Sequence, residues 1–246
     1  MQDNNILVPC IGYQNINARY RPLSDHTFES TIAGNNGLCD NCLQRLREIW
    51  IESLLEPEHK AMSFDTFKIE QCNTAYVKAQ EYAKSSDGSI VLWGKKYGTG
   101  KTHLAISIAR YMIDNYPMDS FNYPVRCPAN FTTESDLLDR IRASFSNNGE
   151  TEHTIISQFT KPRILVLDDV GKVTPQNTDF LHRIMFILID RIYRQHNRLI
   201  LTTNLGMAEL SIHMGEACVS RLHEMGKIIE VKGMDYRLNY PEFGIV

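Results

Sequence analysis

The chain has 246 residues, of which 43% are hydrophobic and 22% are charged. These fractions are typical of a globular protein, and the length favours one large domain with a small appendage. The net charge of −3 means that any nucleic-acid contact depends on a local basic patch. No apolar run approaches the ~18 residues of a membrane span, and the first residues lack the positive segment and apolar core of a signal peptide. We therefore expect a cytoplasmic protein with no membrane partner.

Residues 1–60 differ in composition from the rest of the chain. Up to residue 41 the sequence is rich in Asn, Pro, Gly and Tyr without a periodic pattern, which predicts loops and turns. Residues 41–55 carry apolar side chains at helical spacing and predict an amphipathic helix. This helix should end at Glu56-Pro57, because proline disfavours helix in the residue before it. We predict a small N-terminal partner-binding module over residues 1–60 and a larger domain over residues 61–246.

Cys39 and Cys42 have the Cys-x-x-Cys spacing of a zinc half-site. Two thiolates on a tight turn can share one tetrahedral ion, and a complete structural Zn²⁺ site needs four ligands. Cys10 and His26 are the nearby candidates for the other two, although no second Cys-x-x-Cys pair accompanies them. The alternatives are a pair of reduced thiols at a helix start, or a redox pair, for which a thioredoxin-like strand is missing. The sequence leaves all three open.

A glycine-rich loop follows the first elements of the larger domain. After a predicted helix over residues 74–84, an apolar run at residues 90–93 predicts a buried strand, and residues 101–111 predict a helix. A strand, a glycine turn and a helix that begins Gly-Lys-Thr form a phosphate-binding loop. The glycines let backbone N–H groups surround a phosphate, the lysine reaches the β- and γ-phosphates, and the threonine hydroxyl coordinates Mg²⁺. The predicted ATP-binding residues are Gly98, Thr99, Gly100, Lys101, Thr102 and His103.

One position departs from the spacing of this motif. Gly94 lies one residue earlier than the first glycine of the usual pattern. The motif therefore specifies the cradle from Gly98 to Thr102 but not the turn over residues 95–97.

Further along the chain, residues 125–131 predict a strand that is interrupted at Pro128. Thr133 is a predicted N-cap for a helix over residues 134–145, because its hydroxyl can accept from an unpaired N–H group. A short helix is predicted over residues 154–159.

Two acids follow the next strand. Residues 164–167 are four consecutive apolar residues, which predict a buried parallel strand, and Asp168 and Asp169 come directly after them. Ligands of open α/β sheets bind beyond the carboxyl ends of the strands, so these acids should lie beside the phosphate-binding loop. We expect Asp168 to hold Mg²⁺ and Asp169 to orient the attacking water. The alternative is that both acids form a solvated strand end or a helix cap.

A third buried strand, over residues 199–203, follows a predicted helix at residues 181–193 and ends in Asn204. The amide of Asn204 would then lie near the γ-phosphate. The rest of the chain predicts helices over residues 207–214 and 216–225 and a last strand over residues 228–231.

The sequence resembles the DnaC/IstB-like clade of AAA+ ATPases and, within it, the bacterial helicase loaders. The resemblance covers residues 63–238 and rests on five segments in a fixed order. They are Gly-Thr-Gly-Lys-Thr-His-Leu-Ala (98–105), Leu-Val-Leu-Asp-Asp-Val-Gly (165–171), Thr-Thr-Asn-Leu (202–205), Ser-Arg-Leu (220–222) and Gly-Met-Asp-Tyr-Arg (233–237).

The resemblance implies a role for individual residues. It implies a sensor-1 residue at Asn204, an arginine finger at Arg221 that reaches a neighbouring subunit's ATP, and a sensor-2 arginine at Arg237. The alternative for both arginines is a place on the surface near the C-terminus. The helix over residues 134–145 matches an element that contacts single-stranded DNA in this branch, with Arg140, Arg142 and Ser144 as its phosphate contacts. A solvated helix face is the alternative there.

The resemblance implies a fold and a function as well. We expect a P-loop AAA+ α/β domain with a five-stranded parallel sheet flanked by helices. We also expect ATP-dependent loading of a replicative DnaB-type helicase onto single-stranded DNA, with Mg²⁺ as cofactor and side-by-side assembly into a homo-oligomer. Hydrolysis should be slow, since Asp169 stands where most AAA+ proteins have Glu. The rival interpretations are an IstB-like transposition helper ATPase and a nucleotide-gated binding module that does not hydrolyse ATP.

Overall fold

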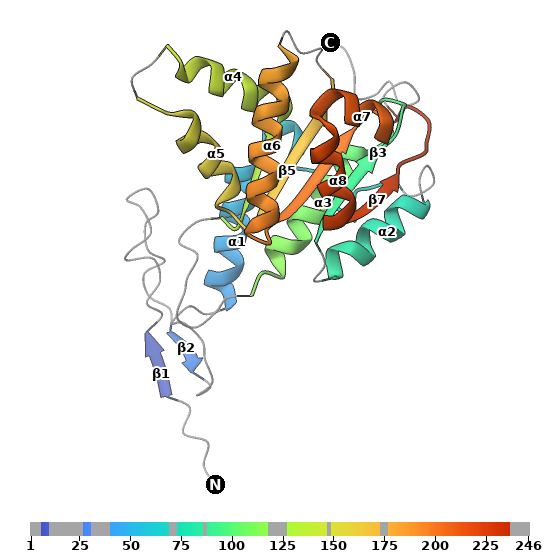
Figure 1. The fold of residues 1–246 in the computed structure, drawn as a ribbon. Coiled ribbons are helices and arrows are strands. Elements are labelled where there is room, and N and C mark those ends of the chain that lie inside the picture. Colours follow the sequence, from blue (N-terminus) through green and yellow to red (C-terminus); the bar gives the residue numbers. More distant parts are fainter. Residues whose placement is uncertain are drawn as a thin grey trace, which may run out of the picture.

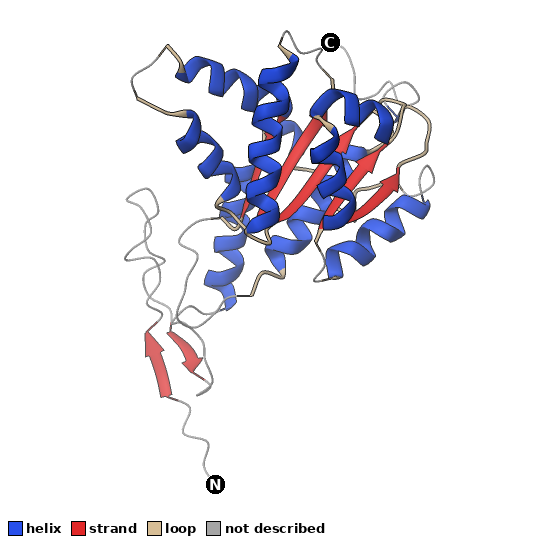
Figure 2. Cartoon of the chain, in the orientation of Figure 1, coloured by secondary structure: helices blue, strands red, loops and turns tan. Residues whose placement is uncertain are grey.

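A parallel β-sheet forms the centre of the computed structural model. The structure describes residues 6–9, 27–30, 40–68, 73–85, 88–117, 127–146, 149–172 and 177–236. Five strands are hydrogen-bonded in the order β4-β5-β6-β3-β7, and all four neighbouring pairs are parallel. Helices cover both faces of this sheet (Figures 1 and 2). The strands are β3 (Ser89–Trp93), β4 (Ala129–Thr133), β5 (Ile164–Val170), β6 (Arg198–Thr203) and β7 (Gly226–Glu230). The predicted five-stranded α/β fold is confirmed.

The central strands were predictable because nearly all their residues are buried. In β5 the side chains alternate between the two faces of the sheet, as the twofold period of a strand requires. Ile164 and Val166 join one hydrophobic core, whereas Leu165 and Leu167 join the other. The prediction placed the start of β4 too early. The described strand begins at Ala129, directly after Pro128, which has no N–H group to donate to a neighbouring strand.

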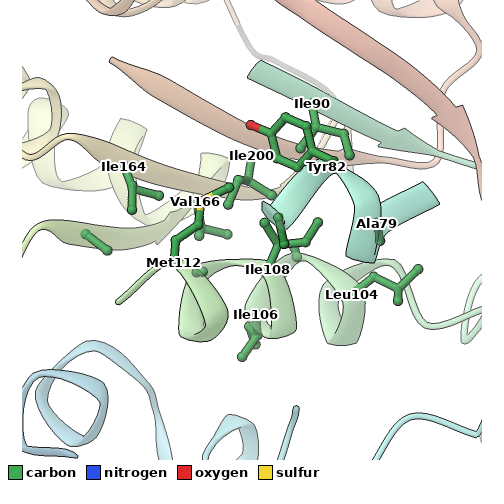
Figure 3. Packing of buried hydrophobic residues seen from close by; sticks show 14 of the residues in the cluster. Ala79, Tyr82, Ile90, Leu104, Ile106, Ile108, Met112, Ile164, Val166 and Ile200 are labelled. Atoms are coloured by element: carbon green, nitrogen blue, oxygen red, sulfur yellow. The ribbon is translucent and has the colours of Figure 1, made fainter. Parts of the chain in front are cut away.

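The first core lies between the sheet and three helices, α1 (Asp40–Leu54), α2 (Asn73–Lys84) and α3 (Lys101–Asp114). Figure 3 shows Ile108 and Met112 of α3 directed toward Val166 and neighbouring strand residues. The second core lies on the opposite face. Its helices are α4 (Glu134–Ser144), α5 (Glu152–Thr160), α6 (Thr178–Arg194), α7 (Met207–Met214) and α8 (Glu216–Met225).

Helix α1 packs on the core of the sheet domain. Leu46, Trp50 and Ile51 are buried in the first core, and α1 contacts both α3 and β4. A short 3₁₀ helix (Pro57–His59) follows α1, after the break that the proline predicted. The predicted boundary at residue 60 therefore lies after a helix that shares the core of the larger domain.

The N-terminal segment contains a pair of strands that the sequence did not predict. β1 (Ile6–Pro9) pairs with β2 (Thr27–Ser30) in antiparallel orientation, so the expectation of loops and turns alone is wrong for these residues. The two strands are short and flanked by residues without a periodic pattern, so sequence gives little signal for them. Among the helices of the described residues, none combines the length and apolar character that crossing a bilayer requires.

The predicted zinc ligands cannot be compared with the structure. Cys10, His26 and Cys39 lie outside the described residues, and Cys42 lies within α1. Within the described ranges, no group of three or more His, Cys, Asp or Glu side chains could hold a metal ion. The zinc site stays a prediction.

Candidate nucleotide-binding site

The loop between β3 and α3 has the backbone geometry of an anion cradle. Gly98 and Gly100 have φ angles of 63° and 90°, a region that residues with a Cβ rarely adopt. A Cβ added at Gly100 would lie 2.6 Å from the Phe67 ring, and one at Gly98 would lie 1.8 Å from an Asp235 carboxylate oxygen. Gly100 is the N-cap of α3 and has no side chain to cap the helix. The first N–H groups of α3 can therefore bind an anion.

Lys101 is folded into this loop. Only 6% of the residue is exposed, and its Nζ donates to the carbonyl oxygens of Gly94 at 3.1 Å and Lys96 at 2.7 Å. Its Nζ also lies 3.3 Å from Thr99 Oγ1. The ammonium group is therefore held at the cradle where a phosphate would bind.

The unusual spacing of Gly94 has a structural reason. Gly94 extends the sheet, since its N–H donates to the Thr203 carbonyl oxygen at 3.1 Å. A Cβ added there would lie 2.5 Å from the carbonyl oxygen of Val231. Gly94 is thus required for close packing of the strands, and the loop turns only after it.

Asp168 and Thr102 meet at the end of β5. The Thr102 hydroxyl donates to Asp168 Oδ2 at 3.0 Å, and the Thr202 hydroxyl donates to Asp168 Oδ1 at 2.6 Å. Burial raises the pKa of the Asp168 carboxyl group, and the neighbouring Asp169 acts in the same direction, while the two hydroxyl groups and His59 lower it. A hydroxyl and a carboxylate oxygen from two elements are therefore in contact, which is the donor set that Mg²⁺ prefers.

Asp169 is held in an uncommon backbone conformation. Its φ is 56°, and its backbone N–H donates to the Thr202 hydroxyl at 2.9 Å. The carboxylate pairs with Lys172 Nζ at 2.8 Å. Non-glycine residues in this region cost free energy and concentrate at functional sites.

Asn204 supplies the amide that was expected after β6. Its Oδ1 is buried, and among the described residues it has no hydrogen-bond partner. A buried acceptor without a partner is costly, so a ligand or an ordered water is expected to donate to it. Together with the glycine cradle and the Thr102–Asp168 pair, this orphaned acceptor fits a site in which a water beside a bound Mg²⁺–nucleotide donates to Asn204.

Most of these groups line one cavity of about 260 Å³, and Asp168 lies behind its wall, in contact with the lining residue Thr102. The phosphate-binding loop forms one wall, and Asp169, Lys172 and Asn204 lie across from it. The sequence did not predict a further wall, which the linker before α2 and the C-terminal segment supply. Its residues are Met62, Thr66, Phe67, Lys68 and Tyr236.

His103 joins this linker to α3. Its Nε2 lies 2.8 Å from the Ser63 carbonyl oxygen and 3.2 Å from the Thr66 hydroxyl. Burial lowers the pKa of the His103 imidazole, which the hydrogen bond to Ser63 partly offsets. His103 lines the cavity, but its described contacts hold the linker in place, and its contact with nucleotide stays a prediction.

The predicted arginines that the structure describes lie away from the cavity. Arg221 of α8 donates to Asp190 Oδ1 at 2.8 Å and stacks on the Phe186 ring at 4.6 Å, and it does not belong to the described residues that line the cavity. Arg237 lies outside the described residues. Arg140 and Arg142 of α4 pair with Glu150 and Asp139.

Glu134 is a buried residue near the site that sequence reasoning missed. It follows β4 directly, where Thr133 is in register with Asp168. Glu134 Oε2 accepts from the Gly171 N–H at 2.9 Å, and Oε1 contacts His213 Nε2 at 2.8 Å. It therefore connects the start of α4 with the turn that carries Asp169.

We expect Glu134→Ala to lower the free energy of unfolding by about 1–3 kcal/mol, because the partly buried Gly171 N–H loses its acceptor. Thermal melting would measure the loss. Glu134→Gln retains an acceptor oxygen and should have a smaller effect. Equal melting temperatures for the alanine variant and the wild type would contradict this role.

The sheet order and the site at the carboxyl ends of its strands define a P-loop AAA+ fold. Residues 57–242 match the family described as IstB-like ATP binding protein, and the chain belongs to this family. The replicative helicase loader DnaC of Escherichia coli (strain K12) is 24% identical over 188 residues, which are 74% of this chain and 71% of that protein. A putative ATP-binding protein of insertion sequence IS5376 from Geobacillus stearothermophilus is 32% identical over 148 residues, which are 57% of this chain and 52% of that protein.

Solved structures of similar fold include two replication proteins. The crystal structure of the DnaC helicase loader matches with a TM-score of 0.60 and 20% identity, over 72% of this chain and 100% of that chain. The replication initiator DnaA bound to AMPPCP and single-stranded DNA matches with a TM-score of 0.58 and 18% identity, over 78% of this chain and 57% of that chain. At these identities the likeness supports the fold.

Proposed function

We propose that this protein is an ATP-dependent loader that places a replicative DnaB-type helicase onto single-stranded DNA. The contact between Thr102 and Asp168 at the phosphate-binding loop is the observation that carries the proposal, because it makes a nucleotide-controlled switch chemically feasible. The relatives described as helicase loaders span more of this chain than the insertion-sequence relative does, at 74% against 57%. This difference supports the loader over the transposition helper.

The polar groups of the nucleotide site have distinct roles in the proposed switch. The cradle amides and Lys101 bind the phosphates of ATP. Thr102 and Asp168 hold Mg²⁺, which neutralises charge on the phosphate oxygens when it is bound. Asn204 can donate to the γ-phosphate or to the attacking water through its amide. Asp169 orients that water, but its carboxylate pairs with Lys172 and is one methylene shorter than Glu, so slow hydrolysis is expected.

Arg221 is proposed to act on the ATP of a neighbouring subunit. Its location away from its own cavity is compatible with action across an interface, where it would stabilise charge on the γ-phosphate. This role requires assembly into a homo-oligomer.

Arg221→Ala and Lys101→Ala should each hydrolyse ATP at least roughly 100-fold more slowly than the wild type. An equimolar mixture should recover part of the activity, because the intact pocket of one variant meets the intact arginine of the other. Phosphate release measures the rates of the single variants and of their mixture. Arg194→Ala is the control, since Arg194 pairs with the same Asp190 at the surface. A mixture as inactive as its components would contradict the assignment.

The surface at the end of α4 is the proposed contact for single-stranded DNA. Phe145 is 64% exposed, and its ring lies 6.1 Å from Phe180 in an edge-on arrangement. Arg142 and Arg183 each place a guanidinium 5.7 Å from the Phe180 ring. Exposed aromatic rings among arginines can stack on bases without reading the sequence. Glu134 ties the first residue of this helix to the Asp169 turn, so α4 is connected to the nucleotide site.

Phe145→Ser should weaken binding of oligothymidylate by roughly 5–100-fold, since one stacked base is worth about 1–3 kcal/mol. Fluorescence anisotropy in the presence of ATP and Mg²⁺ would measure the affinity. Ile212→Ser, an exposed apolar residue on α7, is the control and should bind normally. Unchanged affinity of the Phe145 variant would place the DNA contact elsewhere.

The N-terminal residues are proposed to bind the helicase. The experiment is copurification of the full chain with the replicative helicase of the same organism, beside a variant that lacks residues 1–39. We expect the full chain to retain the helicase and the shortened chain to lose it. Failure of the full chain to bind the helicase would overturn the loader proposal.

The transposition helper remains the second candidate, because the insertion-sequence relative has the higher identity, 32%. That function predicts ATP-driven filaments on duplex DNA and a transposase partner. A nucleotide-gated module without hydrolysis predicts ATP binding but no phosphate release with DNA present. The same release assay therefore separates the enzyme from the binding module.

A further inference from the structure

We propose a second nucleic-acid contact, a basic hollow at the amino-terminal edge of the sheet that binds the phosphate backbone of single-stranded DNA. The hollow has a volume of about 670 Å³ and lies between the ends of α5 and α6 and the starts of β5 and β6. Its cationic lining residues are Lys161, Arg163 and Arg191, and His153 lines it as well. This inference rests on the proposed function, since the DNA would be the strand that contacts α4.

The hollow is separate from the nucleotide cavity. Arg163 directly precedes β5, whose other end carries Asp168. At ~3.3 Å per residue, the step of five positions from Arg163 to Asp168 spans roughly 17 Å along the strand. The two sites therefore lie at opposite edges of the same sheet.

The two arginines of the hollow are held by neutral groups. Arg191 donates to the Ser157 hydroxyl at 2.9 Å, and Arg163 contacts Asn197 Oδ1 at 3.4 Å. Asn197 is itself 7% exposed and donates to the Thr160 carbonyl oxygen at 2.7 Å. These contacts orient both guanidinium groups without neutralising their charge.

No carboxylate belongs to the described residues that line the hollow. Glu152, a nearby acid of α5, accepts two hydrogen bonds from Arg183, at 2.7 and 2.6 Å, and its charge interacts more weakly with Arg191. The C-terminal ends of α5 and α6 point toward the hollow, and each carries about −0.5 of an elementary charge. Together the two helix ends offset roughly one of the three positive charges, which belong to Lys161, Arg163 and Arg191. A net positive charge is left for an anionic ligand.

The lining identifies the kind of ligand. The side chains are polar or charged and include no Phe, Tyr or Trp, so the imidazole of His153 is the one aromatic ring among the described lining residues. Guanidinium groups pair well with phosphate oxygens, so contact with a phosphodiester backbone, without base recognition, is expected.

The position of the hollow continues the proposed DNA surface. Helices α5 and α6 pack side by side (Figure 1). We call the contact line between these two helices the seam. Arg183 donates a hydrogen bond to Glu152 near its start, and Arg191 donates one to Ser157 further along. The eight residues from Arg183 to Arg191 rise roughly 12 Å along α6. A single strand that stacks on Phe145 can therefore extend along the seam toward the hollow.

The test compares two double variants of the full chain by anisotropy with oligothymidylates, in the presence of ATP and Mg²⁺ and over a range of salt concentrations. Lys161→Gln with Arg191→Gln removes two charges from the hollow. Lys84→Gln with Lys227→Gln is the matched control, since both lysines are exposed on α2 and β7 at the other side of the domain. Melting temperatures verify that both variants are folded.

We expect the hollow variant to bind a long oligonucleotide roughly tenfold more weakly than the control does. The slope of log K against log salt concentration should fall by about 1.4, since each phosphate contact on a single strand contributes about 0.7. An oligonucleotide too short to reach beyond α4 should bind the wild type, the hollow variant and the control variant with equal affinity.

Equal affinities of the hollow and control variants for the long oligonucleotide would overturn this inference and leave the α4 contact intact. Displacement of the long oligonucleotide by polyglutamate of equal charge would overturn it in favour of an acidic peptide. Absence of DNA binding by the wild type would instead overturn the DNA contact of the proposed function itself.

Discussion

Lys101→Ala is expected to raise the dissociation constant for ATP by at least roughly 100-fold. The Lys101 ammonium group lies at the phosphate cradle, and one or two charge-assisted hydrogen bonds to phosphate, each worth about 1.5–3 kcal/mol, account for a loss of this size. Isothermal titration with ATP and Mg²⁺ measures the constant directly.

A neighbouring lysine gives a matched control for this variant. Lys95 is in the same loop, but its side chain is largely exposed and lies 3.8 Å from Glu209. Lys95→Ala removes the same charge and should leave the affinity for ATP within about threefold of the wild type, since surface ion pairs contribute little. Wild-type affinity in the Lys101 variant would show that the cradle does not bind the phosphates.

Asp168→Asn should slow ATP hydrolysis by at least roughly 100-fold, because the proposed Mg²⁺ site loses its carboxylate. Phosphate release measures the rate. The affinity for ATP should also be measured once with Mg²⁺ and once with EDTA. The two values should be similar for the variant but should differ for the wild type. A variant with the wild-type rate and the wild-type response to EDTA would contradict the assignment of Asp168 to Mg²⁺.

The same variant should change the pH dependence of stability in the absence of nucleotide. Burial raises the pKa of Asp168 above the ordinary value of 3.8, so the folded state binds the proton more tightly than the unfolded state does. The stabilisation is complete below the unfolded pKa and is lost as pH rises through the folded pKa. Asp168→Asn should lack this decline, whereas Asp139→Asn, at an exposed position on α4, should retain it. Denaturant unfolding at a series of pH values measures the difference.

The sequence predicted the parts of the fold that depend on local pattern. The apolar runs of β3, β5 and β6 identify buried strands whatever their neighbours, and Thr133 is an N-cap because its own hydroxyl accepts from the Asp136 N–H. The glycine loop and the acids near the carboxyl end of β5 lie side by side as expected, since parallel strands end at one edge of the sheet.

The remaining features depend on contacts between distant segments. Phe67 and Tyr236 complete the nucleotide cavity although they are 169 residues apart, and nothing in the sequence indicates that the two rings line the same cavity. Gly94 is explained only by the approach of Val231. Arg140 looked available to DNA in the sequence, but its partner Glu150 lies beyond the end of the helix.

The most direct measurement is the loading of the replicative helicase of the same organism onto circular single-stranded DNA. Our account predicts that more helicase is bound to the circular DNA when the wild-type chain, ATP and Mg²⁺ are present than when the helicase is added alone. Lys101→Ala should abolish this gain, and Lys95→Ala should preserve it. A wild-type chain that loads no helicase, or that loads it equally well without ATP, would contradict the account.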